Sequence, residues 1–174
     1  MVTNISRRAI NNCAKLPSTL CVLAERTADG KHLIFTSVDS LKGRGDEVAR
    51  WDIDPQAGFW FFSLSPDGSR LAVTSSRRGP IHVLSLRGRP EQVIPTRLNN
   101  GDEFYWTVDG KRLLVPEDWQ GKSMLWNLDL GGNRHLIWQD FGTHLTSGIP
   151  SPDGRHVALL TSRSTNNYWM MENF

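Results

Sequence analysis

Short hydrophobic runs recur along the whole chain, separated by polar, glycine-rich or proline-rich turns. Residues 22–25, 59–64, 103–106 and 145–149 are such runs, and each precedes an aspartate–glycine pair and a second run. The runs are too short for helices, and Val, Ile, Leu and Phe are frequent in them, which is typical of buried strands. No segment of ten or more residues carries a capped helical stripe. The pattern therefore predicts an all-β chain.

One phrase occurs four times. Two copies read Ser-Pro-Asp-Gly, at 65–68 and 151–154, while the other two have Ala28 and Val108 in place of the proline. The four aspartates are 38, 42 and 44 residues apart. Aspartate accepts hydrogen bonds from nearby backbone amides and glycine adopts positive φ without strain, so each copy predicts a tight hairpin turn. The predicted structural turn residues are Asp29 and Gly30, Asp67 and Gly68, Asp109 and Gly110, and Asp153 and Gly154.

Further strand patterns follow each phrase, so that each repeat contains three or four strands. Four-stranded units of about 40–45 residues are typical of propeller blades, which stack because one sheet cannot bury both of its faces alone. We therefore expect a single domain, a β-propeller or half-propeller of four blades, each of three to four antiparallel strands. The expected blades are about 13–56, 57–97, 98–140 and 141–174. A β-sandwich is the weaker alternative because one phrase recurs so regularly.

The repeated phrase resembles the WD-like repeat of TolB-type bacterial β-propellers. Residues 21–25, 41–45 and 167–174 also resemble the C-terminal half of the propeller region of bacterial serine/threonine kinases and winged-helix regulators. The resemblance implies a sensory or interaction module, in that group one that lies outside the membrane. The chain contains no kinase motif and no winged-helix segment. The signalling output of that group therefore does not carry over.

Composition and charge mainly exclude classes of partner and location. Lys and Arg number 20 against 18 Asp and Glu, a formal charge of +2, so nothing favours nucleic acid or an anionic membrane. We expect no transmembrane segment and, because no apolar signal region follows Met1, a cytoplasmic chain as written, or an extracytoplasmic one if it is a fragment of a membrane-anchored sensor. Cys13 and Cys21 are read either as two separate thiols or as a pair in an oxidising compartment.

No arrangement of residues predicts an enzyme, a metal site or a cofactor. The five histidines are scattered, no Gly-x-Ser-x-Gly elbow occurs, and two cysteines without a nearby histidine cannot hold zinc. His32 and His156 occupy the same position in their repeats. Equivalent positions in a repeat usually have equivalent structural roles, so we interpret both histidines as structural rather than catalytic. We expect neither a catalytic site nor a cofactor.

Candidate contacts with a ligand or partner come from loops and from the first strand of each blade. Trp119 lies in a loop outside the repeat. Lys42 and Arg44 lie at a glycine-rich tip between two expected strands. The backbone amides of this tip can bind an anion, or the tip is simply a solvated hairpin loop. The expected first strands place Glu25, Ser63, Glu103 and His144 along a central channel.

These features favour a non-catalytic module that binds a protein, a peptide or a small ligand. The alternatives are an enzyme, or an accessory domain of one, with a site at the channel, and a truncated sensor fragment.

We also expect the propeller ring to close. Residues 4–10 have the alternation of an edge strand, within a segment 1–12 that can serve as a closing outer strand on residues 168–172. Closure within one chain gives four blades, and closure between two chains gives a homodimer of eight.

Overall fold

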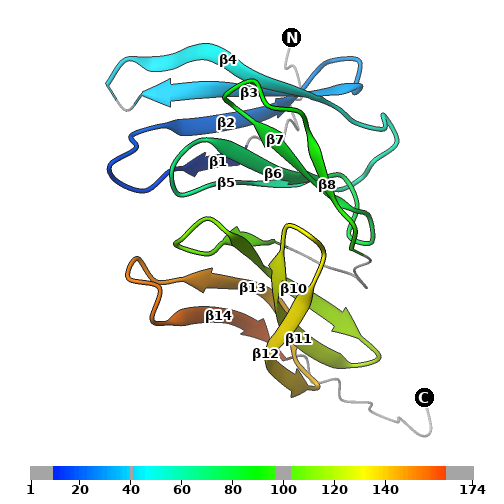
Figure 1. Ribbon diagram of the computed structural model, residues 1–174. Coiled ribbons are helices and arrows are strands. Elements are labelled where there is room, and N and C mark those ends of the chain that lie inside the picture. The colour runs from blue at the N-terminus through cyan, green and yellow to red at the C-terminus, as the bar shows by residue number, and fades with distance from the viewer. Residues whose placement is uncertain (1–9, 40, 97–102, 164–174) are drawn as a thin grey trace, which may run out of the picture.

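The computed structural model describes residues 10–39, 41–96 and 103–163, with backbone only for Ile10 and Asn11. These residues form fourteen strands and no helix, arranged as antiparallel sheets that stack on one another (Figure 1). The all-β prediction is confirmed. Within this part of the chain no helix exists that is long and apolar enough to cross a membrane.

The first sheet contains one strand more than the repeat predicts at its inner edge. Its order is β1 (Ile10–Cys13), β2 (Cys21–Arg26), β3 (His32–Asp39) and β4 (Gly43–Asp52). We expected residues up to 12 to serve as a closing outer strand, but residues 10–12 pair with β2 instead. Residues 4–9 and 168–172 lie outside the described residues, so the closure itself stays a prediction.

The other sheets begin with the strand that precedes the repeated phrase. The second sheet contains β5 (Phe61–Leu64), β6 (Arg70–Thr74), β7 (Ile81–Ser85) and β8 (Gln92–Ile94) in that order. The third contains β9 (Tyr105–Trp106), β10 (Arg112–Trp119), β11 (Lys122–Asp129) and β12 (Arg134–Phe141). The fourth has two described strands, β13 (His144–Pro150) and β14 (Val157–Ser162).

In the second and third sheets, alternating side chains pack against the sheets on either side, as the period of a strand requires. In β5, Phe62 is buried against the first sheet and its neighbour Phe61 against the third. In β10, Leu113 packs toward the second sheet and Leu114 toward the fourth. Because both faces of the middle sheets are buried, β5, β6 and β10 contain runs of consecutive buried residues, whereas the outer strands β8 and β12 are largely exposed. The stack is therefore a series of propeller blades.

The inner edges of the four blades meet. Strand β1 contacts β5, β5 contacts β9, and β9 contacts β13. In the second, third and fourth blades the innermost strand precedes the aspartate–glycine turn, whereas in the first blade β1 takes that place and β2 becomes the second strand. The extra strand decides which side chains reach the axis of the stack.

The four turns have one geometry. The glycines adopt φ values of +74°, +69°, +66° and +71° in chain order, as predicted. In the second turn, Ser65 Oγ donates to Asp67 Oδ1 at 2.6 Å, and the same carboxylate oxygen accepts the Ser69 amide at 3.1 Å. The equivalent pair of bonds occurs in the other three turns, where the hydroxyl comes from Thr27, Thr107 or Ser151. A hydroxyl two residues before the aspartate therefore belongs to the phrase.

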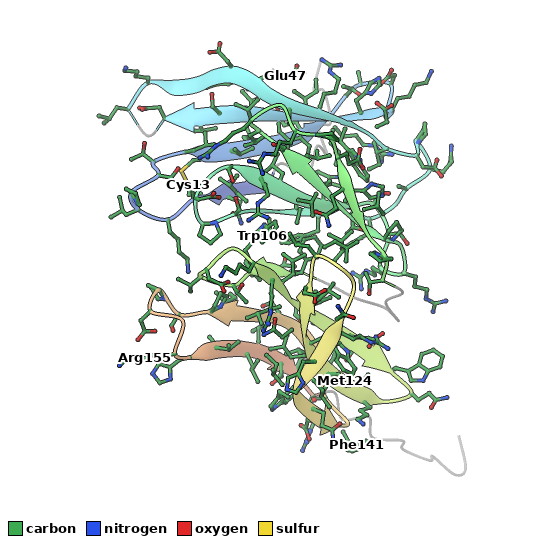
Figure 2. All side chains as sticks on the ribbon, viewed as in Figure 1. Cys13, Glu47, Trp106, Met124, Phe141 and Arg155 are labelled. Carbon is green, nitrogen blue, oxygen red and sulfur yellow. A yellow bond between two sulfur atoms is a disulfide. The ribbon has the colours of Figure 1, made fainter. Side chains whose placement is uncertain are left out.

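Arginine side chains tie neighbouring blades together. Arg26 donates to the carbonyls of Ala57 and Asp54, at 2.9 and 2.6 Å. Arg70 donates to the carbonyl of Gly110 at 2.6 Å, and its guanidinium lies 4.8 Å from the centre of the Trp106 ring. Trp106 lies between the second and third sheets (Figure 2). Arg26 thus holds the connection between β4 and β5 against the first blade, and Arg70 joins the second blade to a turn of the third.

Candidate functional site

The four inner strands surround a pocket of about 210 Å³. Every blade contributes two residues from its innermost strand, and two further residues come from the segments that follow β1 and β5. The lining residues are Asn12 and Cys13 of β1, Ser63 and Leu64 of β5, Tyr105 and Trp106 of β9, Ile149 and Pro150 of β13, and Lys15 and Pro66. We call this the axial pocket.

Lys15 places a positive charge in the wall of the axial pocket. Its Nζ atom is buried and makes no hydrogen bond to any residue that the structure describes. The backbone around it is held firmly, because the Lys15 amide donates to the carbonyl of Pro66 at 2.8 Å. A buried ammonium without a partner is unfavourable unless a counter-charge reaches it. The pocket is therefore suited to an anionic group.

The disulfide between Cys13 and Cys21 holds the strand that carries this wall. The two cysteines lie opposite each other in the register of β1 and β2, with their Cα atoms 3.9 Å apart. The sequence left open whether Cys13 and Cys21 are separate thiols or a pair, and in the structure they are paired. The bridge closes the loop that contains Lys15, so it limits the positions that the ammonium can take.

Tyr105 of β9 also lines the axial pocket. Burial raises the pKa of Tyr105 to about 12, and the charge of Glu103 and the bond to it act in the same direction. The hydroxyl donates to Glu103 Oε2 at 3.0 Å. Glu103 is thus placed beside the axial pocket through Tyr105, although its own side chain is not part of the lining.

The prediction that Glu25 lines the axis is wrong. Its strand, β2, is the second of its blade because β1 occupies the inner edge. Glu25 instead forms an ion pair with Arg44 of β4, so two candidates chosen separately from the sequence meet on the first sheet. Ser63, which was also expected along the channel, does line the axial pocket.

The tip between β3 and β4 uses its amides internally. Asp39 Oδ1 accepts the amides of Leu41 and Lys42, both at 2.8 Å, and these bonds lower the pKa of Asp39. An anion at this tip would have to replace that carboxylate. The geometry is that of a solvated hairpin with Lys42 and Arg44 exposed. Their role as ligand contacts stays a prediction.

Trp119 ends β10 next to a turn in which Gln120 has a φ of +51°. Its side chain is 49% exposed. The residue is therefore available for contact at a blade tip, and it is not among the residues that line the axial pocket.

His144 belongs to a different cluster. Its Nδ1 atom contacts the carboxylate of Asp118 of β10, which also accepts a hydrogen bond from the Ser123 hydroxyl. Serine hydrolases place histidine between serine and aspartate, so that the imidazole takes the hydroxyl proton. Here the aspartate lies between the other two, and Ser123 is completely buried. The cluster links β10, β11 and β13, and it has no accessible nucleophile.

Two features of the site were missed by sequence reasoning. Lys15 follows a strand that residue patterns did not reveal, and nothing near it in the chain marks it as buried. Asp118 is adjacent to Trp119, and only the pairing of blades brings it to His144. Among the described residues, no three His, Cys, Asp or Glu side chains come together as a metal site.

The fold is that of TolB β-propellers. A candidate TolB of Agrobacterium tumefaciens superimposes with a TM-score of 0.64 at 17% identity, over 83% of this chain and 50% of that protein. TolB of Acinetobacter baumannii gives 0.60 at 24% identity, over 84% of this chain and 36% of that protein. A candidate 6-phosphogluconolactonase of Bacteroides fragilis gives 0.51 at 12% identity, over 87% and 47%.

These likenesses define a class of fold. The chain is a TolB-like β-propeller in architecture, and it spans half or less of the length of these structures. No protein-family model matches it, and no curated protein does. The kinase and regulator resemblance therefore rests on the sequence phrases alone.

Proposed function

We propose that this chain is a non-catalytic binding module that receives an anionic group of a protein, a peptide or a small ligand in the axial pocket. The observation that carries the proposal is the buried Nζ of Lys15, which has no partner in the described residues. The pocket is small, about 210 Å³, so it suits one carboxylate-bearing side chain or terminus rather than a whole metabolite. Binding through one group on a rigid inner edge fits an interaction module.

The chemistry around the pocket supports binding over catalysis. Lys15 supplies a cation, and the Tyr105 hydroxyl is already bonded to Glu103, so the lining offers a group that recognises charge and no free acid or base. Cys13, the one lining residue with a nucleophilic side chain of high reactivity, is in a disulfide. The Ser123 cluster lies elsewhere and is buried.

Lys15→Met separates binding from stability. We expect the variant to lose affinity for N-acetyl-aspartate amide by at least tenfold in calorimetric titration, with N-acetyl-asparagine amide as the uncharged comparison. Its free energy of unfolding should rise by about 1 kcal/mol, because a buried unpaired charge is removed. Lys31→Met, at an exposed turn position, should change neither quantity.

Two results would contradict the proposal. Equal binding by the wild type and by Lys15→Met would show that the ammonium does not receive the carboxylate. A large loss of stability in Lys15→Met would show that Nζ has a structural partner in the folded chain.

A further inference from the structure

A second pocket, of about 440 Å³, lies against the second blade where it faces the third. Its walls come from the start of β6, the end of β7 and the turn between β7 and β8. Arg70, Arg87 and Arg89 line it together with Asp67, Ser69 and Ser85. It shares no lining residue with the axial pocket.

The pocket is strongly positive. Its lining contains three arginines and one aspartate, and Arg87 and Arg89 form no ion pair or side-chain hydrogen bond with the described part of the chain. Burial alone would raise the pKa of Asp67, but hydrogen bonds from Ser65 and Ser69 outweigh it and lower the pKa to about 2. Asp67 is therefore charged near neutral pH and is occupied by its own turn.

The other acid of this hairpin is directed elsewhere. The Glu91 carboxylate contacts His82 Nδ1, and the His82 ring lies 5.0 Å from that of Trp51 in the first blade. His82 alternates with Ile81 and Val83, which pack toward the third blade, so Glu91 is drawn to the opposite face of the second sheet. Nothing from the hairpin neutralises Arg87 and Arg89.

Contacts on both sides of the pocket keep its shape. Arg70 Nη2 donates to the Gly110 carbonyl at 2.6 Å, and Gln92 Nε2 donates to the Leu130 carbonyl at 2.8 Å. Both bonds run from the second blade to turns of the third. Gly88, between the two unpaired arginines, has a φ of +73°, so the chain reverses there and both arginines stay at one turn.

We propose that this pocket binds the phosphate group of a small phosphorylated metabolite. Guanidinium groups match phosphate oxygens with paired N–H donors, and several arginines around one anion favour a doubly charged phosphate monoester over a single carboxylate. Ser85 Oγ accepts the Arg87 amide at 3.2 Å, which leaves its O–H free to donate to a phosphate oxygen. The volume lies within the range of about 300–1,000 Å³ of small-molecule sites, and Val83 and Pro90 provide apolar contact for the organic part.

The test is calorimetric titration of the whole chain with glycerol 3-phosphate, inorganic phosphate and glycerol. We expect both phosphates to bind, glycerol 3-phosphate at least as tightly as inorganic phosphate, and glycerol not to bind. Arg87→Gln with Arg89→Gln should weaken binding of both by at least tenfold. The matched control is Lys31→Gln with Arg155→Gln, which removes the same charge from exposed positions in other blades. It should bind within twofold of the wild type.

Two further readouts make every outcome decisive. Amide NMR of the wild type should show the Gly88 signal moving with glycerol 3-phosphate, and the double variant should melt within 2 °C of the wild type, because both arginines are exposed and unpaired. Equal weakening in the double variant and the control would overturn the proposal, since net charge alone would then explain binding. Wild-type affinity in the double variant, or no binding by the wild type, would overturn it as well. Lys15→Met should bind phosphate normally, so the outcome is independent of the axial pocket.

Discussion

Replacing Gly68 by alanine tests both the turn geometry and its packing against the loop after β1. Gly68 has a φ of +69°, and a Cβ atom built there lies 2.6 Å from Ser18 Oγ and 3.4 Å from Ala14 Cβ. Gly30 has nearly the same φ, +74°, but its Cβ would meet nothing closer than 3.6 Å. The two glycines therefore share backbone strain and differ in the space around them.

The expected magnitudes follow from that difference. A non-glycine residue in the left-handed region costs about 1–2 kcal/mol, which applies to both positions. The close approach to Ser18 Oγ adds about 1 kcal/mol at Gly68 alone, the low end of overpacking costs, because a serine hydroxyl can rotate away. Gly68→Ala should therefore lower the free energy of unfolding by about 2–3 kcal/mol, and Gly30→Ala by about 1–2 kcal/mol.

Urea unfolding followed by tryptophan fluorescence measures both variants, with a double-mutant cycle to isolate the contact. Ser18→Ala removes the hydroxyl, so Gly68→Ala should cost about 1 kcal/mol less in that background than in the wild type. Equal losses for Gly68→Ala and Gly30→Ala, with no coupling to Ser18, would refute the packing part. No loss at either position would refute the turn geometry.

Further predictions address the core, the bridge, the charge and the assembly. Phe62→Ala should cost about 3–5 kcal/mol in urea unfolding because the ring is fully buried between the first two blades, whereas Phe141→Ala, 65% exposed, should cost less than about 0.5 kcal/mol. Reducing the Cys13–Cys21 bridge, which closes a loop of nine residues, should cost about 2.5 kcal/mol, seen as a lower unfolding midpoint with reductant. Because the folded pKa of Asp67, about 2, lies below its ordinary 3.8, its contribution to stability is complete above about pH 4 to 5 and is lost as the pH falls through 2; Asp67→Asn should flatten that part of the pH profile. Closure between two chains predicts a mass of about 39 kDa in light scattering, twice 19.7 kDa, and a monomer would contradict it.

Local features of the fold were predictable because they depend on neighbours in the chain. The turn at Asp67 and Gly68 is set by a hydroxyl, a carboxylate and a residue without Cβ within four positions, and all three can be read from the phrase. The apolar runs on either side identify strands, and their recurrence identifies blades. Even so, β1 was missed, since Ile10-Asn11-Asn12-Cys13 has no apolar alternation of its own and is a strand because β2 lies beside it.

The all-β class, the blade repeat and the geometry of the turns follow from the amino-acid sequence, because hydrogen bonds between near neighbours and the period of a strand act over a few residues. The tertiary structure decided which polar groups meet. Lys15 became a buried cation only because β1 took the inner edge of the first blade, and this same strand moved Glu25 away from the axis. Arg70, Arg87 and Arg89 cluster because β6 pairs with β7, which brings Arg70 opposite Ser85 and next to the turn after β7. Such contacts join residues far apart in the chain, and their partners depend on how whole sheets pack.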